Sequence, residues 1–267
     1  MIRPAAVAGR FYPADAAMLL RQIDDCVCVA PQKVRVRGCI VPHAGYMYSG
    51  RVAGTVYGAL ELPSRFILLG PRHYPHGERL AILSEGTWTT PLGDAKIDAP
   101  FADALKDAFP LLRDDAMAHS AEHSLEVQLP FLQRMAGDFT FVPIVIGTDR
   151  FEVLEMLGQA VAQVISGQKE TVLIVASSDM NHRESDTITR GKDRKAIDAI
   201  LALDARELYD TVRRENITMC GYGPAVAMIT AARKLGSTNA ELLQYATSGD
   251  VNGDREDVVG YAGIIVR

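Results

Sequence analysis

A short apolar run meets a glycine-bearing loop in the stretch Cys39-Ile40-Val41-Pro42-His43-Ala44-Gly45-Tyr46-Met47-Tyr48-Ser49-Gly50. The apolar run ends at Pro42, a histidine follows at once, and Val52 to Leu60 has the pattern of a helix. This order predicts a buried strand that presents His43 just beyond its carboxyl end. Ligands bind at that edge of open α/β sheets. We therefore expect a functional site at this end of the strand.

Two later stretches repeat the arrangement of apolar run, turn and histidine. They are Phe66-Ile67-Leu68-Leu69-Gly70-Pro71-Arg72-His73 and Val172-Leu173-Ile174-Val175-Ala176-Ser177-Ser178-Asp179-Met180-Asn181-His182. A single histidine after a strand is more often a hydrogen-bonded structural residue than a ligand. Three of them at equivalent strand ends favour a shared site at one rim of one sheet, because such rims are where pockets form.

Apolar strands alternate with amphipathic helices along the whole chain, and no linker or repeat interrupts them. Among the expected helices are one capped by Asp15 that runs to about Cys28, one from about Lys192 to Leu203, and one from about Ala225 to Leu235. This alternation predicts one α/β domain, residues 1–267, built as a three-layer α/β/α sandwich around a mostly parallel or mixed central sheet.

The composition of the 267 residues narrows the class of protein. Hydrophobic residues make up 48% and charged residues 23%, and the formal net charge is −5. This balance argues against nucleic acid or an anionic membrane as partner, because no basic surplus exists to neutralise phosphates. No apolar run approaches the roughly 20 residues of a membrane span, and the N-terminus lacks the apolar core of a signal peptide. The four cysteines show no Cys-x-x-Cys spacing, which favours a cytoplasmic setting.

Cys220 is the fourth candidate site residue. It directly precedes Gly221-Tyr222-Gly223-Pro224 and a helix, and a thiol at a helix N-terminus is pushed toward thiolate. A thiolate with two neutral imidazoles suits iron, copper or zinc. The alternative is a buried cysteine that packs as a small hydrophobe, and we assign Cys26, Cys28 and Cys39 to that class.

Further polar residues cluster near these candidates. Asp179 could orient an imidazole or act as acid or base, although capping a helix is its ordinary role. His182 is the stronger candidate for a general base, because an unperturbed imidazole titrates near neutrality. In the segment His119-Ser120-Ala121-Glu122-His123-Ser124-Leu125-Glu126 we expect His123 to line the pocket, and His119, like His76, to meet solvent. No nucleotide cofactor is expected, because neither a dinucleotide fingerprint nor a phosphate-binding loop is present.

Seven stretches, in order from residue 7 to residue 221, resemble the Memo family, also called AmmeMemoRadiSam system protein B in prokaryotes. They are Val7-Ala8-Gly9-Arg10-Phe11-Tyr12-Pro13, Pro42-His43-Ala44-Gly45-Tyr46-Met47-Tyr48-Ser49-Gly50, Leu69-Gly70-Pro71-Arg72-His73, Thr90-Pro91-Leu92-Gly93-Asp94, Glu122-His123-Ser124-Leu125-Glu126-Val127-Gln128-Leu129-Pro130-Phe131-Leu132, Ser177-Ser178-Asp179-Met180-Asn181-His182 and Cys220-Gly221. The resemblance implies the fold of class III extradiol dioxygenases, in which two histidines and a glutamate hold ferrous iron.

The resemblance also implies roles for single residues. His43 and His73 match the two histidine ligands, Cys220 stands where the carboxylate ligand is expected, and His182 matches the acid/base histidine, with Asp179 in the same cluster. It implies iron or copper as the metal, with zinc as a further option, and a radical-SAM protein and an AMMECR1-like protein as partners. We expect Tyr46 and His123 to contact a small-molecule substrate or a peptide in the rim cleft.

The sequence departs from the family pattern at two points. The family's usual Ser-Ser-Asp-Phe-Ser-His is Ser-Ser-Asp-Met-Asn-His here, which places Asn181 beside the site. Cys220 in place of a carboxylate argues against ordinary ring cleavage, because a thiolate is itself easily oxidised by oxygen chemistry.

Three hypotheses follow from these residues. The first is a metal-binding protein with a dioxygenase-like site, redox- or oxygen-linked on a small molecule; whether it is an enzyme stays open, and a non-haem metal-dependent oxidoreductase is the class that fits. The second is a non-enzymatic module that binds a peptide or protein in a vestigial cleft. The third is a metal-free hydrolase with Cys220 as nucleophile, His182 as base and Asp179 as its orienter.

Overall fold

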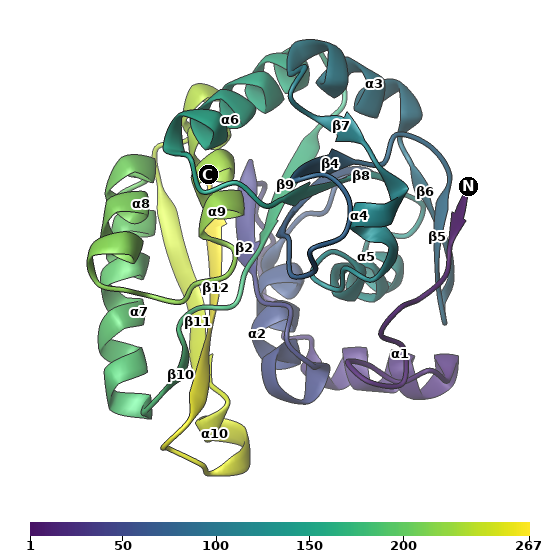
Figure 1. Cartoon of the computed structure of the whole chain (residues 1–267). Coiled ribbons are helices and arrows are strands. Elements are labelled where there is room, and N and C mark those ends of the chain that lie inside the picture. The colour runs from purple at the N-terminus through teal and green to yellow at the C-terminus, as the bar shows by residue number, and fades with distance from the viewer.

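The computed structural model describes all residues from 1 to 267, and one twelve-stranded sheet runs through them (Figure 1). The strands are β1 (Ile2–Arg3), β2 (Gly38–Val41), β3 (Arg65–Pro71), β4 (Leu80–Ile82), β5 (Thr87–Thr90), β6 (Gly93–Ile97), β7 (Arg113–Asp114), β8 (Thr140–Ile146), β9 (Val172–Ser177), β10 (His182–Glu184), β11 (Ala240–Thr247) and β12 (Val258–Val266). The helices are α1 (Ala16–Cys26), α2 (Tyr46–Ala59), α3 (Ala99–Ala108), α4 (Ala116–Ser120), α5 (Leu129–Met135), α6 (Phe151–Ser166), α7 (Asp186–Leu201), α8 (Ala205–Arg214), α9 (Tyr222–Lys234) and α10 (Gly249–Asn252), with a 3-10 turn η1 (Glu126–Gln128).

The sheet is mixed, and its centre is parallel. The strand order is β1-β5-β6-β8-β3-β9-β2-β12-β10, with β11 paired to β12 and β4 paired to β7 and β8. Strands β8, β3, β9 and β2 run parallel to one another, whereas β12 is antiparallel to β2. In this register Val41 is opposite Ser177 and Leu69 is opposite Ala176. The segments that carry His43, His73 and Asp179 therefore leave the sheet at one common edge. His182, the third histidine expected there, lies on β10, which pairs with β12.

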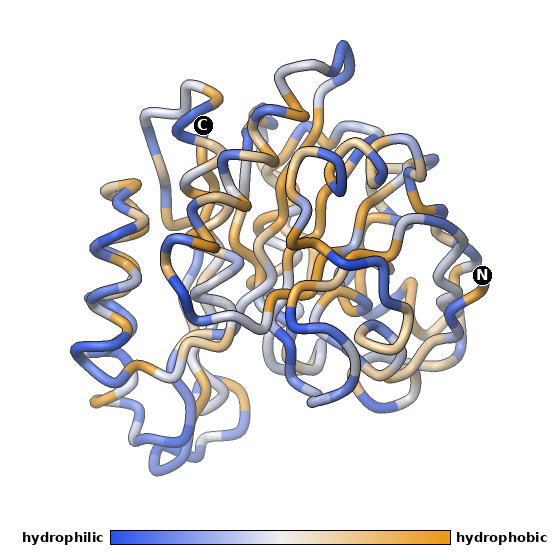
Figure 2. The backbone as a smooth tube through the Cα atoms, turned by 45° about the horizontal axis from the view of Figure 1, so that its top comes forward, coloured by the Kyte–Doolittle hydropathy of each residue, from blue (hydrophilic) through white to orange (hydrophobic).

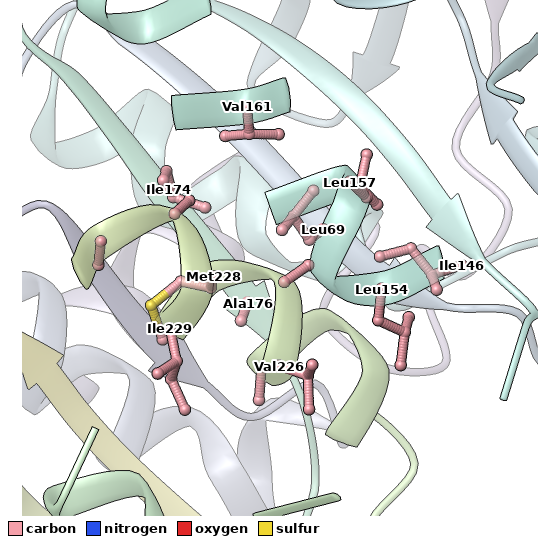
Figure 3. Packing of buried hydrophobic residues seen from close by; sticks show 14 of the residues in the cluster. Leu69, Ile146, Leu154, Leu157, Val161, Ile174, Ala176, Val226, Met228 and Ile229 are labelled. Atoms are coloured by element: carbon pink, nitrogen blue, oxygen red, sulfur yellow. The ribbon is translucent and has the colours of Figure 1, made fainter. Parts of the chain in front are cut away.

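The alternation of side chains along the central strands creates two cores, one on each face of the sheet. On β9, Ile174 and Ala176 pack into a cluster with α6 and α9, whereas Leu173 and Val175 face the cluster that includes residues of α1, α2 and α5. Figure 3 shows part of the first of these clusters, including Leu154 and Leu157 of α6, Val226 and Met228 of α9, and Ile174 and Ala176 of β9. Hydrophobic segments gather at the centre of the molecule and hydrophilic ones at its periphery (Figure 2). These two cores are the physical basis of the α/β/α sandwich.

Several element bounds differ from the sequence prediction. Helix α2 begins at Tyr46, before Gly50, where the glycines predict a loop. Its glycines instead allow close packing: a Cβ on Gly54 or Gly58 would collide with the backbone carbonyl of Cys26 or Cys28. Helix α7 begins at Asp186 instead of Lys192. Asp15 caps α1 through the amide of Met18, as predicted.

No helix is both long and apolar enough to cross a membrane.

Candidate metal centre

Three histidines from three separate segments meet at the carboxyl edge of the parallel strands. His43 follows β2, His73 follows β3, and His123 lies between α4 and η1. One ligand atom from each ring lies within 4.8 Å of those of the other two. The ring centroids are 5.2 Å apart for His43 and His73, 5.6 Å for His43 and His123, and 4.4 Å for His73 and His123. This arrangement is a group that could hold a metal ion.

The tautomer of His43 follows from its hydrogen bonds. The hydroxyl of Ser177 donates to the carbonyl of Ser124 at 2.6 Å, so its oxygen can only accept from other groups. It accepts from the amide of Gln128 at 2.9 Å, and the Nδ1 atom of His43 lies 2.9 Å away. Nδ1 of His43 must therefore carry the proton. Nε2 is left with a free lone pair, which is the state a metal ligand needs.

Glu122 sets the tautomer of His73 in the same way. Its Oε1 atom lies 2.8 Å from Nδ1 of His73, and its Oε2 accepts from the backbone amide of His73 at 2.7 Å. Burial opposes the charge of Glu122, but the hydrogen bonds from His73 prevail and lower the pKa of Glu122 to about 2. The carboxylate is therefore ionised, Nδ1 of His73 donates to it, and Nε2 is the free ring nitrogen.

His123 completes the group without such an orienting partner. Its ring stacks on His73 and packs against Phe11 at 4.7 Å between centroids. Its Nδ1 atom is buried and makes no hydrogen bond. Burial and the neighbouring His43 and His73 lower the pKa of His123 to about 4. The imidazole is therefore neutral near pH 7 and has a buried polar atom without a partner.

Cys220 borders this group. Its Sγ atom lies 3.2 Å from Nε2 of His43 and 3.6 Å from the carbonyl of Asp179. The thiol is placed by Gly221, whose amide donates to Oγ of Ser178 at 3.0 Å and whose missing Cβ would collide with Ser177 and Ser178. Burial, reinforced by the charge of Asp179, raises the pKa of the Cys220 thiol above its ordinary value. Burial therefore outweighs the effect of the helix terminus that the sequence predicts.

Asp179 holds the loop that carries His43. Its Oδ1 atom accepts from the backbone amides of His43 at 2.8 Å and Ala44 at 3.3 Å. No helix begins after it, because β9 ends at Ser177 and the chain continues into β10. The ordinary role considered for it, a helix cap, is therefore absent. Burial raises the pKa of Asp179, so the carboxyl takes up a proton more readily than an exposed aspartate.

His182 is anchored by Thr218. The Nδ1 atom of His182 lies 3.0 Å from the carbonyl of Thr218, and its backbone amide donates to the Thr218 hydroxyl at 2.7 Å. Because a carbonyl only accepts, Nδ1 carries the proton and Nε2 is free to take up another. The ring is thus oriented by Thr218 and not by Asp179.

Asn181 ties the segment of His182 to the segment that leads to Cys220. It is fully buried, and its Oδ1 atom accepts from both the amide and the hydroxyl of Thr218, at 3.0 and 3.1 Å. Its Nδ2 atom donates to Glu184 and Thr189. A serine, usual in the resembling family, is too short to make both sets of contacts.

We expect Asn181→Ala to lower the free energy of unfolding by about 1–3 kcal/mol, because it removes the hydrogen bonds that this buried amide makes with Thr218, Glu184 and Thr189. The imidazole resonances of His182 should also shift in NMR spectra, while those of the exposed His76 stay in place. Asn252→Ala, at an exposed asparagine, is the matched control. Unchanged stability and unchanged His182 resonances would show that Asn181 positions nothing.

Two other histidines and Tyr46 lie away from the group. His76 is exposed, as expected, whereas His119 is fully buried beside Trp88 and was wrongly expected to meet solvent. Tyr46 packs against Tyr12 and Phe131, and its hydroxyl donates to the carbonyl of Val127 at 2.6 Å. That hydroxyl has no second hydrogen to offer a ligand, and a substrate contact by Tyr46 stays a prediction.

The orienting residues Glu122, Ser177 and Gln128 were not assigned these roles from the sequence. The sequence does point to Glu122, because it lies next to His123 in a polar cluster. Nothing in the sequence points to Gln128, because its side chain hydrogen-bonds to Ser177, which is 49 positions away.

A buried ion pair clamps the N-terminal segment against this site. Arg3 and Glu126 meet at 2.6 Å, with side chains 4% and 0% exposed. Glu126 also accepts from the amides of Ala6 and Val7 and from the hydroxyl of Tyr12. Arg3 donates in addition to the carbonyl of Glu122 at 2.7 Å. The clamp thereby fixes both the loop that carries Phe11 and the segment that carries Glu122 and His123.

Comparison with known proteins places the chain in a family. A family model described as Memo-like protein matches residues 3–265. The chain is 43% identical over 268 residues to the MEMO1 family protein of Methanosarcina acetivorans, covering 100% of this chain and 99% of that protein. It is 40% identical over 287 residues to the MEMO1 family protein MK0963 of Methanopyrus kandleri, with the same two coverages.

Among solved structures, the uncharacterized protein JW3007 from Escherichia coli K12 is similar with a TM-score of 0.58. That match covers 86% of this chain and 100% of the other at 12% identity, so it bears on the fold alone. The sequence matches extend over essentially the whole chain, and they confirm the resemblance read from its motifs. The chain therefore belongs to the Memo-like protein family.

Proposed function

We propose that this protein binds one iron or copper ion at His43 and His73, and that it acts in a redox- or oxygen-linked reaction on a small molecule. The observation that carries the proposal is the matched protonation of the two rings. Both donate Nδ1–H to a fixed acceptor, Ser177 for His43 and Glu122 for His73, and both keep Nε2 free. Metal-ligating histidines are held by such outer partners as a rule.

The donor set fits a transition metal. Imidazole nitrogen suits iron, copper and zinc, and a thiolate favours the softer of these. Two residues are available as the third ligand: His123, whose unpartnered Nδ1 lies in the three-histidine group, and Cys220, whose Sγ is near Nε2 of His43. A bound iron or copper ion would supply one-electron redox chemistry to the reaction.

The residues around the group can move protons. His182 has Nε2 free and its Nδ1 proton held by Thr218, which suits a general base. Asp179 has no protein partner for its second carboxyl oxygen, Oδ2, among its hydrogen bonds. We therefore assign proton transfer to Nε2 of His182, with Asp179 holding the His43 loop and facing the same space.

Metal content tests the proposal. Protein purified without a His-tag under anaerobic conditions should contain roughly one iron or copper ion per chain, and His43→Ala and His73→Ala should lose it. Comparing His123→Ala with Cys220→Ala identifies the third ligand, since only the variant that removes that ligand loses most of the metal.

Matched controls come from the same molecule. His76→Ala removes an exposed histidine from the loop of His73, and Cys28→Ala removes an exposed cysteine. Both should keep the wild-type metal content. Failure of the wild type to hold iron or copper after loading, or full retention by His43→Ala, would rule out this site.

One observation favours a second function, a metal-free nucleophile. Sγ of Cys220 lies within hydrogen-bond reach of Nε2 of His43, and Ser177 orients that ring. The base in this version is His43 and not His182. The raised pKa of the thiol weighs against it. Cys220 alkylation that is fast near pH 7 in excess chelator would support this function over the metal one.

A further inference from the structure

A cavity of about 450 Å3 lies beside the candidate metal centre. Its walls come from the loop of residues 9–13, from Met18 and Gln22 of α1, and from Gly45, Met47 and Tyr48 at the start of α2. Helices α1 and α2 lie next to each other at the lower edge of the molecule (Figure 1). None of the roles assigned above uses this cavity.

Much of the cavity wall is exposed apolar surface. Met18 is 54% and Met47 is 64% exposed, and Phe11 and Tyr48 are partly exposed beside them. Two exposed methionines with two aromatic rings around one hollow form a surface suited to an apolar ligand, because methionine adapts its shape to what it contacts.

Phe11 connects the cavity to the histidine group. Phe11 lines the cavity, and its ring packs 4.7 Å from the ring of His123. Gly45, another wall residue, is two positions from His43, and the carbonyl of Phe11 accepts from the next amide, that of Tyr46, at 2.8 Å. Phe11 and Gly45 therefore form the boundary between the cavity and the histidine group.

The loop of residues 9–13 in the cavity wall is also held in place by its own hydrogen bonds. The loop closes on itself through the amides of Gly9, Arg10 and Phe11, which donate to the carbonyls of Tyr12 and Val7 at 2.7 to 3.0 Å. The Tyr12 hydroxyl fixes it to buried Glu126 at 2.6 Å. A preformed wall lowers the cost of ordering on binding.

Two polar groups on the wall lack partners. Arg10 is exposed, makes no ion pair with any carboxylate of the chain, and is the only charged residue that lines the cavity. The Oε1 atom of Gln22 is buried and makes no hydrogen bond. The guanidinium favours an anionic ligand, and the amide offers one further contact to a donor.

We propose that this cavity binds an aryl or alkyl carboxylate, with the carboxylate at Arg10 and the apolar arm against Phe11, whose ring contacts His123. The inference rests on the proposed function, because it assigns a substrate class to that site. It makes Arg10, Met18 and Met47 the residues that select the substrate.

Methionine methyl NMR tests the location. The chain has nine methionines, and Met18→Leu and Met47→Leu assign the two in the wall. Titration of the 13C-methyl-labelled protein with 4-phenylbutyrate should shift the signals of Met18 and Met47. Met117 and Met156, which are 63% and 50% exposed elsewhere, should not move. Shifts of equal size at all exposed methionines, or none at Met18 and Met47, overturn the proposal.

The alcohol 4-phenylbutanol and the variant Arg10→Ala test the charge. Wild type should bind the acid about fivefold more tightly than the alcohol, as expected of one exposed ion pair, and Arg10→Ala should remove that difference without weakening the alcohol. Equal binding of the two probes by wild type overturns the carboxylate class. Metal content of the same samples is measured separately. If 4-phenylbutyrate binds at Met18 and Met47 in protein that takes up no metal, this inference stands and the metal site is rejected. If the protein takes up metal but 4-phenylbutyrate does not bind at Met18 and Met47, the metal site stands and this inference is rejected.

Discussion

Replacing Glu126 by alanine is expected to lower the free energy of unfolding by about 3–5 kcal/mol, because it leaves a buried guanidinium without its counter-charge. Arg3 is 4% exposed, and it has no second carboxylate within reach. The same change removes the acceptor for Ala6, Val7 and Tyr12, so the loop that carries Phe11 should loosen. Denaturant unfolding followed by circular dichroism measures the loss.

Glu61→Ala is the control for this prediction. Glu61 also pairs with an arginine, Arg35, at 2.7 Å, but both side chains lie mostly in solvent. We expect no measurable change in stability for that variant, since exposed pairs contribute little. Equal effects of the two substitutions would show that burial does not set the strength of the Arg3 pair. If Glu126→Ala proves too unstable to purify, Tyr12→Phe removes one hydrogen bond to Glu126 and should give a smaller loss of the same kind.

Glu122→Gln is expected to weaken metal binding by about 10- to 100-fold while leaving every candidate ligand in place. The glutamine amide can accept from only one of the two groups of His73 that Glu122 now serves, its Nδ1–H and its backbone amide. The substitution also removes the negative charge of Glu122 next to the His73 ring. Competition with a chelator of known affinity measures the change.

Glu78→Gln serves as the control, because Glu78 is an exposed carboxylate in the same loop as His73. It should bind metal as the wild type does. A wild-type affinity in Glu122→Gln would mean that His73 is not oriented through Glu122, or is not a ligand.

The fold could be predicted from the sequence because its central strands are buried on both faces and therefore appear in the sequence as unbroken apolar runs. Those of β3 and β9 end at a glycine or a serine pair, which marks the edge where the site forms. Helix starts were harder. The glycines of α2 look like loop residues, and only the contact of Gly54 with the backbone after α1 explains why the helix needs them.

The sequence predicts the candidate site only in part. His43, His73 and Cys220 stand out because each follows a predicted strand or precedes a predicted helix. The structure places His43 near His73 and near Cys220, but the group that could hold a metal ion consists of His43, His73 and His123. The sequence does not predict the burial of His119, because it depends on the packing of Trp88 of β5 against α4. The roles of Ser177 and Gln128 were hidden for a similar reason: common polar residues gain a function only through partners distant in the sequence.

The separation of the donor residues along the chain has a consequence for the order of folding. His43 and Cys220 are 177 positions apart, and His73 and Glu122 are 49 apart. No short segment gathers enough donors to chelate a metal, so an unfolded chain would hold an ion weakly, and a bound ion would stabilise only the folded state. During synthesis the centre cannot close until β9, which pairs with both β2 and β3 and carries Ser177, has emerged and packed into the sheet. Metal uptake would then come late and would mark those molecules whose central sheet is complete.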